Sequence, residues 1–127
     1  MNSDQKFMKL FFIRMFILLA AVVAVVVVFD PFYQYHKPLP GLKAVLTDKE
    51  YQCIGTLRTF DYDALIVGSS VCENYNNHWF DEGFGSKTIK AIRSYGATAD
   101  LCYLLDNAYE EHDLKYVFYN IDPSSLS

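Results

Sequence analysis

Each of three expected strands has, at its carboxyl end, a residue that could take part in acyl transfer. These residues are a serine hydroxyl within Gly68-Ser69-Ser70, the backbone N–H of Gly96 and the side-chain amide of Asn120. In an open sheet of parallel strands, the loops at the carboxyl ends meet at one edge, and ligands bind there. A serine hydroxyl can attack a carbonyl carbon while N–H groups hold the oxyanion that develops. The sequence therefore predicts a candidate acyl-transfer site at this edge.

The strands that must position these residues alternate with helices along the chain. Apolar runs predict strands at 64–67, 88–92 and 116–121, and apolar periodicity predicts helices at 48–59 and 99–111, the second with Thr98 as its N-cap. The mixed, aromatic segment 71–82 is expected to form a short irregular helix. Right-handed crossovers make the three strands parallel, with the helices packed on the sheet. We therefore expect an α/β fold with a partial, flavodoxin-like three-layer sheet in the strand order 2-1-3.

The segment from Leu10 to Phe29 is apolar throughout except for Arg14. Twenty helical residues rise about 30 Å, enough to cross the hydrocarbon core of a bilayer. The segment therefore predicts an N-terminal transmembrane helix and a lipid bilayer as partner. A cleaved signal peptide is the alternative, with Val22 and Ala24 at the −3 and −1 positions of the cleavage site.

The charges that flank the apolar segment predict its orientation. Lys6, Lys9 and Arg14 lie toward its N-terminal end against one acid, Asp4, so the positive-inside rule leaves the N-terminus in the cytoplasm. The predicted organisation is a cytoplasmic N-terminus (1–9), a single plasma-membrane anchor (10–29), a proline-rich stalk (30–41) and an extracytoplasmic α/β domain (42–127).

The composition of the outer part argues against several classes of partner. From Asp30 to Ser127 there are 8 Lys and Arg against 14 Asp and Glu, a formal charge of −6. Such an acidic domain is not expected to bind nucleic acid. The three cysteines, Cys53, Cys72 and Cys102, show no metal-ligand spacing and are expected to be small buried thiols. No pattern points to a metal or another cofactor.

The stretch YDALIVGSSV resembles the first conserved block of the SGNH (GDSL-like) hydrolase superfamily, with GSS where many members have GDS. The resemblance implies that Ser70 is the nucleophile and that its own N–H faces the oxyanion. Gly96, in RSYGATA, resembles the glycine of the second block and would be a second oxyanion donor. Asn120, in YNID, lies where the third-block asparagine is expected, although Phe118 replaces the usual glycine. Together with the stalk DPFYQYHKPLPGL, the chain resembles membrane-anchored SGNH-like proteins of Gram-positive bacteria.

The chain departs from that superfamily in lacking the DxxH block that supplies the acid and the general base. Its three histidines are His36, His78 and His112, and none is expected near Ser70. We therefore expect this chain to be the N-terminal part of a longer protein and to have little or no activity by itself, since a serine without a base is a weak nucleophile.

The resemblance implies hydrolysis or transfer of an ester-linked acyl group on cell-envelope glycan or polymer. Two other classes remain open from the sequence. One is a non-catalytic binding or scaffold protein at the cell surface. The other is a single-pass membrane protein whose outer domain supports assembly with another subunit.

Overall fold

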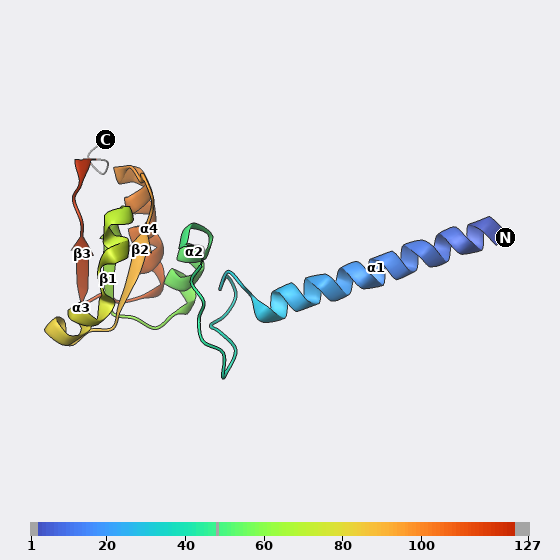
Figure 1. Ribbon diagram of the computed structural model, residues 1–127, viewed down its shortest axis with the longest axis horizontal. Helices are drawn as coiled ribbons and strands as arrows, with labels where there is room; N and C mark the ends of the chain where they lie inside the picture. Colours follow the sequence, from blue (N-terminus) through green and yellow to red (C-terminus); the bar gives the residue numbers. More distant parts are fainter. Residues whose placement is uncertain (1–2, 48, 124–127) are drawn as a thin grey trace. The chain divides into compact units, whose positions relative to one another are not determined.

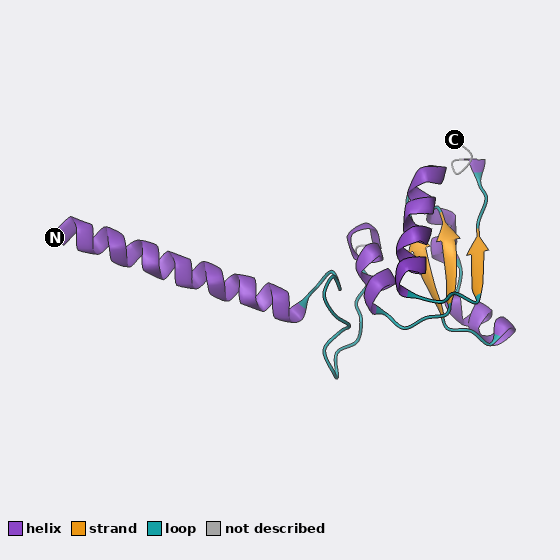
Figure 2. Ribbon diagram, turned by 180° about the vertical axis from the view of Figure 1, so that it is seen from behind, coloured by secondary structure: helices purple, strands orange, loops and turns teal. Residues whose placement is uncertain are grey.

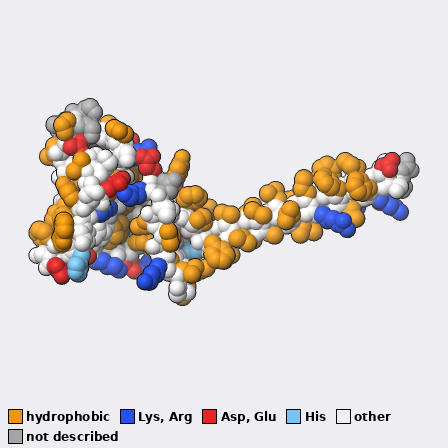
Figure 3. All heavy atoms as spheres, viewed as in Figure 1, with side chains coloured by type: hydrophobic (Ala, Val, Ile, Leu, Met, Phe, Trp, Pro, Cys, Tyr) orange, Lys and Arg blue, Asp and Glu red, His pale blue; other side chains and the backbone are white. Residues whose placement is uncertain are grey.

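The computed structural model describes residues 3–47 and 49–123, and contacts divide the chain into two units, Met1–Pro31 and Phe32–Ser127. The first unit contains helix α1, Ser3–Phe29, whose 27 residues extend about 40 Å. None of its side chains is buried. Figure 3 shows hydrophobic side chains along its length, with Lys and Arg in its N-terminal half. Within the described ranges, α1 is the one helix long and apolar enough to cross a membrane.

The second unit is a mixed α/β domain built on a three-stranded parallel sheet (Figures 1 and 2). Its strands are β1 (Ala64–Gly68), β2 (Thr88–Ile92) and β3 (Tyr116–Tyr119), in the order β2-β1-β3. The predicted strands, their parallel pairing and their order are confirmed. β3 ends two residues earlier than expected, although the Asn120 N–H still donates to Val67 O at 2.8 Å.

Helices cover both faces of this sheet. Successive side chains of a strand point to opposite faces, so Leu65 and Val67 pack on one side of β1 and Ile66 on the other. The first side is covered by α2 (Lys49–Thr59) and α4 (Thr98–Glu111). The second is covered by the 3₁₀ helix η1 (Ser70–Asn74) and α3 (Asn77–Phe84). The predicted layering of helices on the sheet is thus present within residues 49–119.

Two details of the helices differ from expectation. The single helix expected over 71–82 is wrong: η1 and α3 are separate helices, because the Asn76 side chain caps a new helix by accepting from the His78 N–H. α3 then continues to Phe84, and Gly85 ends it in the left-handed conformation. Thr98 is the first residue of α4 and not its N-cap. That place is taken by Ala97, whose N–H donates to the Asp100 carboxylate at 3.0 Å.

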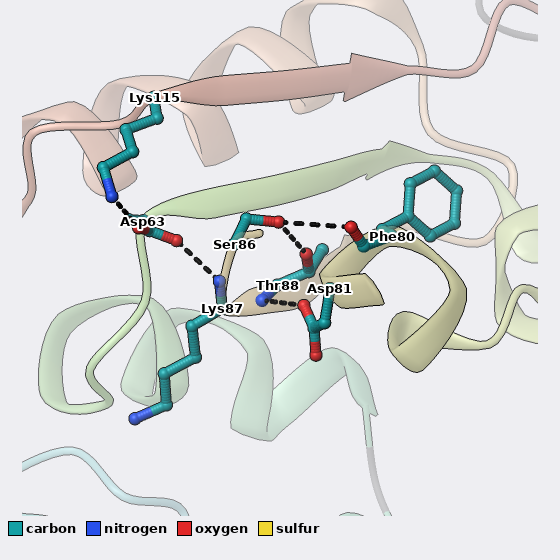
Figure 4. A network of polar contacts seen from close by, with 7 residues as sticks. All are labelled: Asp63, Phe80, Asp81, Ser86, Lys87, Thr88 and Lys115. Atoms are coloured by element: carbon teal, nitrogen blue, oxygen red, sulfur yellow. Dashed lines mark hydrogen bonds and ion pairs between the residues drawn. The ribbon is translucent and has the colours of Figure 1, made fainter. Parts of the chain in front are cut away.

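Asp63 joins the amino ends of the three strands (Figure 4). Its own carbonyl accepts the Lys115 N–H at 2.7 Å at the start of β3. Its carboxylate accepts the Lys87 N–H at 2.6 Å, just before β2, and pairs with the Lys115 ammonium at 2.6 Å. These contacts hold the pKa of Asp63 below its usual 3.8, with the Lys115 side chain the largest cause and the Lys87 N–H next. Asp63 therefore belongs to the framework, at the edge opposite the candidate site.

Part of the segment expected as a stalk packs against α2. The ring of Tyr33 is buried and lies edge-on to Phe60, with 5.3 Å between the ring centroids. The Thr59 hydroxyl donates to the Tyr33 carbonyl at 3.2 Å. A Cβ on Gly55 would lie 2.1 Å from the Phe32 carbonyl oxygen. The glycine that weakens α2 as a helix is therefore the residue that lets the backbone at Phe32 and Tyr33 approach it.

Candidate functional site

The carboxyl ends of the three parallel strands lie at one edge of the sheet, as the arrows in Figure 2 show. Ser69 and Ser70 follow β1 there, and Asn120 and Asp122 follow β3. Gly96 lies beyond β2, before α4. The residues of the predicted site therefore belong to loops at a common edge, as the strand order requires.

Gly68 allows the loop after β1 to turn tightly beneath the candidate site. A Cβ at this position would lie 2.5 Å from Cys72 Sγ and 2.8 Å from Asn120 Cβ. Any larger residue would push η1 and the end of β3 apart. The glycine of the GSS sequence is thus explained by close packing between two site-bearing loops.

Ser69 and Ser70 differ in accessibility and in hydrogen bonding. Ser69 is buried, its hydroxyl donates to Asp122 Oδ2, and its Oγ accepts the Val71 N–H at the start of η1. Ser70 is exposed, and its hydroxyl makes no hydrogen bond to any described residue. Of the two hydroxyls, that of Ser70 is therefore the one that a substrate can reach.

A polar network connects the loops after β1 and β3. Asp122 Oδ2 accepts from Ser69 and also from Asn120 Nδ2, at 3.4 Å. Asn120 Oδ1 accepts from the Tyr75 hydroxyl at 3.1 Å. The sequence places Asp122 after the third strand, at this edge, but indicates no role for it in the site. Tyr75 was missed, and nothing in its spacing indicates its contact with Asn120.

The Gly96 N–H is occupied within its own loop. It donates to the Arg93 carbonyl at 3.1 Å, closing a turn in which Tyr95 has a φ of +54°. A Cβ on Gly96 would lie 2.8 Å from Arg93 Cβ, so the turn itself accounts for the glycine. To donate to an oxyanion, Gly96 would have to release this carbonyl. Asn120 Nδ2 likewise already donates to Asp122.

The three histidines lie away from Ser70. His112 follows α4, and its ring packs on Tyr62 with centroids 4.2 Å apart, next to the amino end of β1. His78 lies in the first turn of α3, 3.0 Å from Glu82 and next to Asn77, whose side chain donates to the Thr88 carbonyl at the amino end of β2. The His36 Nδ1–H donates to the Lys37 carbonyl at 2.8 Å. The described residues therefore bring no imidazole to the edge that carries Ser70.

The cysteines are free thiols with two kinds of environment. Burial raises the pKa of Cys53 to about 11 and also raises that of Cys72, where the Asp122 charge adds to the effect. Both thiols are therefore protonated and poor nucleophiles near neutral pH. Cys102 is exposed, which corrects the expectation that all three are buried: its position on α4 faces away from the core formed by Leu101 and Leu104.

Within the described part of the chain, no three His, Cys, Asp or Glu side chains cluster as metal ligands.

Comparisons with protein families, with curated proteins and with solved structures found no match to this chain.

Proposed function

We propose that this chain is a membrane-anchored, SGNH-like protein of the extracytoplasmic surface that acts on ester-linked acyl groups, with Ser70 as the nucleophile. The observation that carries the proposal is the placement of Ser70. It is an exposed hydroxyl in the first residue of a 3₁₀ helix, directly after the buried central strand of a parallel sheet. This is the edge at which α/β folds place their ligands.

The neighbouring groups support a role for Ser70 rather than Ser69. The Ser69 hydroxyl donates to Asp122, and its oxygen caps η1, so Ser69 stabilises the loop that carries Ser70. Asn120 is fixed from two sides, by Tyr75 and by Asp122. A preorganised amide of this kind can stabilise an oxyanion if the substrate displaces its weaker bond, the one to Asp122 at 3.4 Å.

The proposal needs a general base from outside the described residues. A positioned base contributes about 10²–10⁴-fold to such a reaction, and no described histidine lies at this edge. A further polypeptide segment that carries an Asp-x-x-His sequence would supply it. The proposed substrate is a cell-envelope polymer with acetyl or D-alanyl esters, by analogy with the membrane-anchored SGNH-like proteins that the sequence resembles.

The proposed location combines the long apolar helix with its flanking charges. α1 spans the plasma membrane once, as an uncleaved anchor. Lys6, Lys9 and Arg14 keep its N-terminal end in the cytoplasm. The domain from Phe32 onward would then face the cell envelope, where the proposed substrate is found.

One observation favours a second function, that of a non-catalytic binding or scaffold protein. The Gly96 N–H, expected as an oxyanion donor, is bonded to Arg93 O. In a binding protein this turn would stay closed, and the polar residues at the carboxyl edge would hold a glycan without reacting with it.

Fluorophosphonate labelling and hydrolysis of p-nitrophenyl acetate distinguish the two functions. The purified chain in phosphatidylcholine nanodiscs should show neither reaction at Ser70. When the chain is joined to a segment that carries Asp-x-x-His, both reactions should appear. Ser70→Ala should abolish them. In the matched variant Ser69→Ala, labelling should be retained wherever the domain stays folded. An extended chain that folds but remains inert would reject the esterase proposal in favour of the binding protein.

A further inference from the structure

A cavity that is not lined by Ser70, Gly96 or Asn120 lies beside the edge strand β2. It has a volume of 310 Å³ and is bounded by α2, β2, η1 and the start of α3. This volume is at the lower end of the range of about 300–1,000 Å³ that is typical of small-molecule sites. The cavity is therefore large enough for a short ligand, and the proposed function makes no use of it.

The interior of this cavity is apolar in character. Side chains of five hydrophobic residues line it: Leu46, Cys53, Phe60, Ile89 and Ile92. The side chains of its three neutral polar residues, Gln52, Thr56 and Asn77, donate hydrogen bonds to main-chain carbonyls. Thr56 donates to the Cys53 carbonyl at 2.8 Å, and Asn77 donates to the Thr88 carbonyl at 2.9 Å. Gln52 donates to the Val45 carbonyl at 3.0 Å. Apart from its charged residues, the lining therefore offers an occupant mainly apolar contact.

The charged residues of the lining are two lysines and one glutamate. Lys49 pairs with the Glu73 carboxylate at 2.6 Å. Lys90 donates instead to the main-chain carbonyl of Glu73, at 2.8 Å. No carboxylate among the described residues lies within ion-pair distance of the Lys90 ammonium. The lining therefore has one positive charge more than it has negative ones, in a domain whose overall charge is negative.

The surroundings of Lys90 favour binding of an anion at this cavity. Its pKa is lowered, first because partial burial disfavours the ammonium and second because Lys49 is nearby, while Cys72 and Glu73 act in the opposite direction. An anion in the cavity would relieve both unfavourable effects. The nearby Glu50 does not compete for this place, since it lies toward Arg93, at 4.0 Å.

We propose that this cavity binds a single-chain anionic amphiphile, such as a medium-chain fatty acid, with its alkyl chain against the apolar wall and its carboxylate on Lys90. The inference does not depend on the proposed esterase function, because the cavity lining does not include Ser70, Gly96 or Asn120. It assigns Lys90 to ligand recognition and Lys49, already paired, to holding Glu73 away from the anion.

Photolabelling tests this site in the full chain. The chain is reconstituted in phosphatidylcholine nanodiscs and irradiated with a diazirine analogue of decanoate, and the labelled peptides are identified by mass spectrometry. Label should appear on the peptides that contain Phe60 and Ile89, and excess decanoate should remove it. Decanol and decyltrimethylammonium, with the same chain and no anion, should compete at least about tenfold less well. Equal competition by all three would overturn the proposal.

Matched variants separate the anion contact from a general effect on the fold. Lys90→Met should reduce labelling by about tenfold or more, the loss expected for a charge-assisted hydrogen bond. Lys87→Met, which removes an exposed lysine next to the same strand, should leave labelling unchanged. A neutral diazirine analogue of decanol should still label the Lys90→Met chain, which shows that the cavity is intact. Equal labelling of the two lysine variants would exclude Lys90 as the anion contact.

A further arm distinguishes a free fatty acid from a membrane lipid. Phosphatidylglycerol, an anionic lipid with two chains, is added to the nanodiscs in place of decanoate. Retained labelling of the cavity supports a single-chain ligand. Loss of labelling equal to that caused by decanoate would overturn it, since the anion would then come from a membrane lipid.

Discussion

The two adjacent serines after β1 show how strongly one position can change the environment of a side chain. Ser69 is buried and bonded to Asp122, whereas Ser70 is exposed and makes no hydrogen bond to the described residues. The strand ends at Gly68, Ser69 is the N-cap of η1, and Ser70 is the first residue of that helix. One hydroxyl therefore supports the loop and the other faces solvent.

The free energy of unfolding should distinguish the structural role of Ser69 from the exposed position of Ser70. Ser69→Ala removes a buried hydroxyl, the cap of η1 and a partner of Asp122, and should lower the free energy of unfolding by about 1–3 kcal/mol. Ser70→Ala should change it by less than about 0.5 kcal/mol, as for other exposed positions. Thermal and urea unfolding of the reconstituted chain measure both. Equal losses would mean that Ser70 is also a structural residue.

Asp63 should make stability depend on pH in a defined direction. Its pKa in the folded chain lies below the usual 3.8. A group with a lowered folded pKa adds stability that is fully present above the unfolded value and is lost as the pH falls through the folded value. The difference in Tm between the native chain and Asp63→Asn should therefore be largest near neutral pH and should shrink below about pH 3.8.

Asp106→Asn, an exposed aspartate of α4, is the control for that titration. At neutral pH, the Tm of this variant should stay close to that of the native chain. If the Asp63→Asn difference were constant across the acid range, the ion pair with Lys115 and the Lys87 contact would not be stabilising the sheet through charge.

At the scale of elements, the strands could be predicted because their apolar runs are short and bounded by turn residues. Burial of Ala64–Gly68 on both faces explains why β1 reads as continuous rather than alternating hydrophobicity. The break between η1 and α3 could not be predicted, since it depends on the Asn76 cap and on the packing of Cys72 beneath Gly68. The strand order was enough to predict that the candidate site residues lie at one edge of the sheet. The hydrogen bonds of the Gly96 N–H and of the Asp122 carboxylate could not be predicted, because they depend on the conformations of the loops.

Gly55 and Gly83 provide a matched pair of glycines in helices. At Gly55 a Cβ would lie 2.1 Å from the Phe32 carbonyl oxygen, whereas at Gly83 it would meet nothing within 4 Å. Gly55→Ala should therefore displace the segment at Phe32 and Tyr33, lower Tm and increase proteolysis near Tyr33. Gly83→Ala should raise stability by about 0.5–1 kcal/mol, because alanine favours helix. A stabilising Gly55→Ala would contradict the close approach.

At the scale of the whole molecule, the chain consists of an apolar helix and an acidic α/β domain. The two units need different surroundings, since every side chain of α1 is exposed in the isolated chain. A bilayer around α1 would cover those side chains, while water suits the charged surface of the second unit.

Cys102 can report the side of the membrane on which the domain lies. It is exposed, whereas Cys53 and Cys72 are buried with raised pKa values, so a membrane-impermeant maleimide should label intact cells at Cys102 alone. Cys102→Ser should abolish this labelling. In a Cys102→Ser background, Gln5→Cys should react only after lysis. The reverse pattern would invert the proposed orientation.

The contacts of Asp63 also imply an order of assembly during folding. They join residues 24 positions apart at Lys87 and 52 positions apart at Lys115, and each doubling of a closed loop costs about 0.6 kcal/mol of chain entropy. We therefore expect β1 to pair with β2 before β3 joins during refolding. Pulsed hydrogen exchange should record protection of β2 amides first, and simultaneous protection of β3 would contradict this order. Until β3 pairs, β1 has an open edge, so the folding chain passes through a state that can pair with a strand of another molecule.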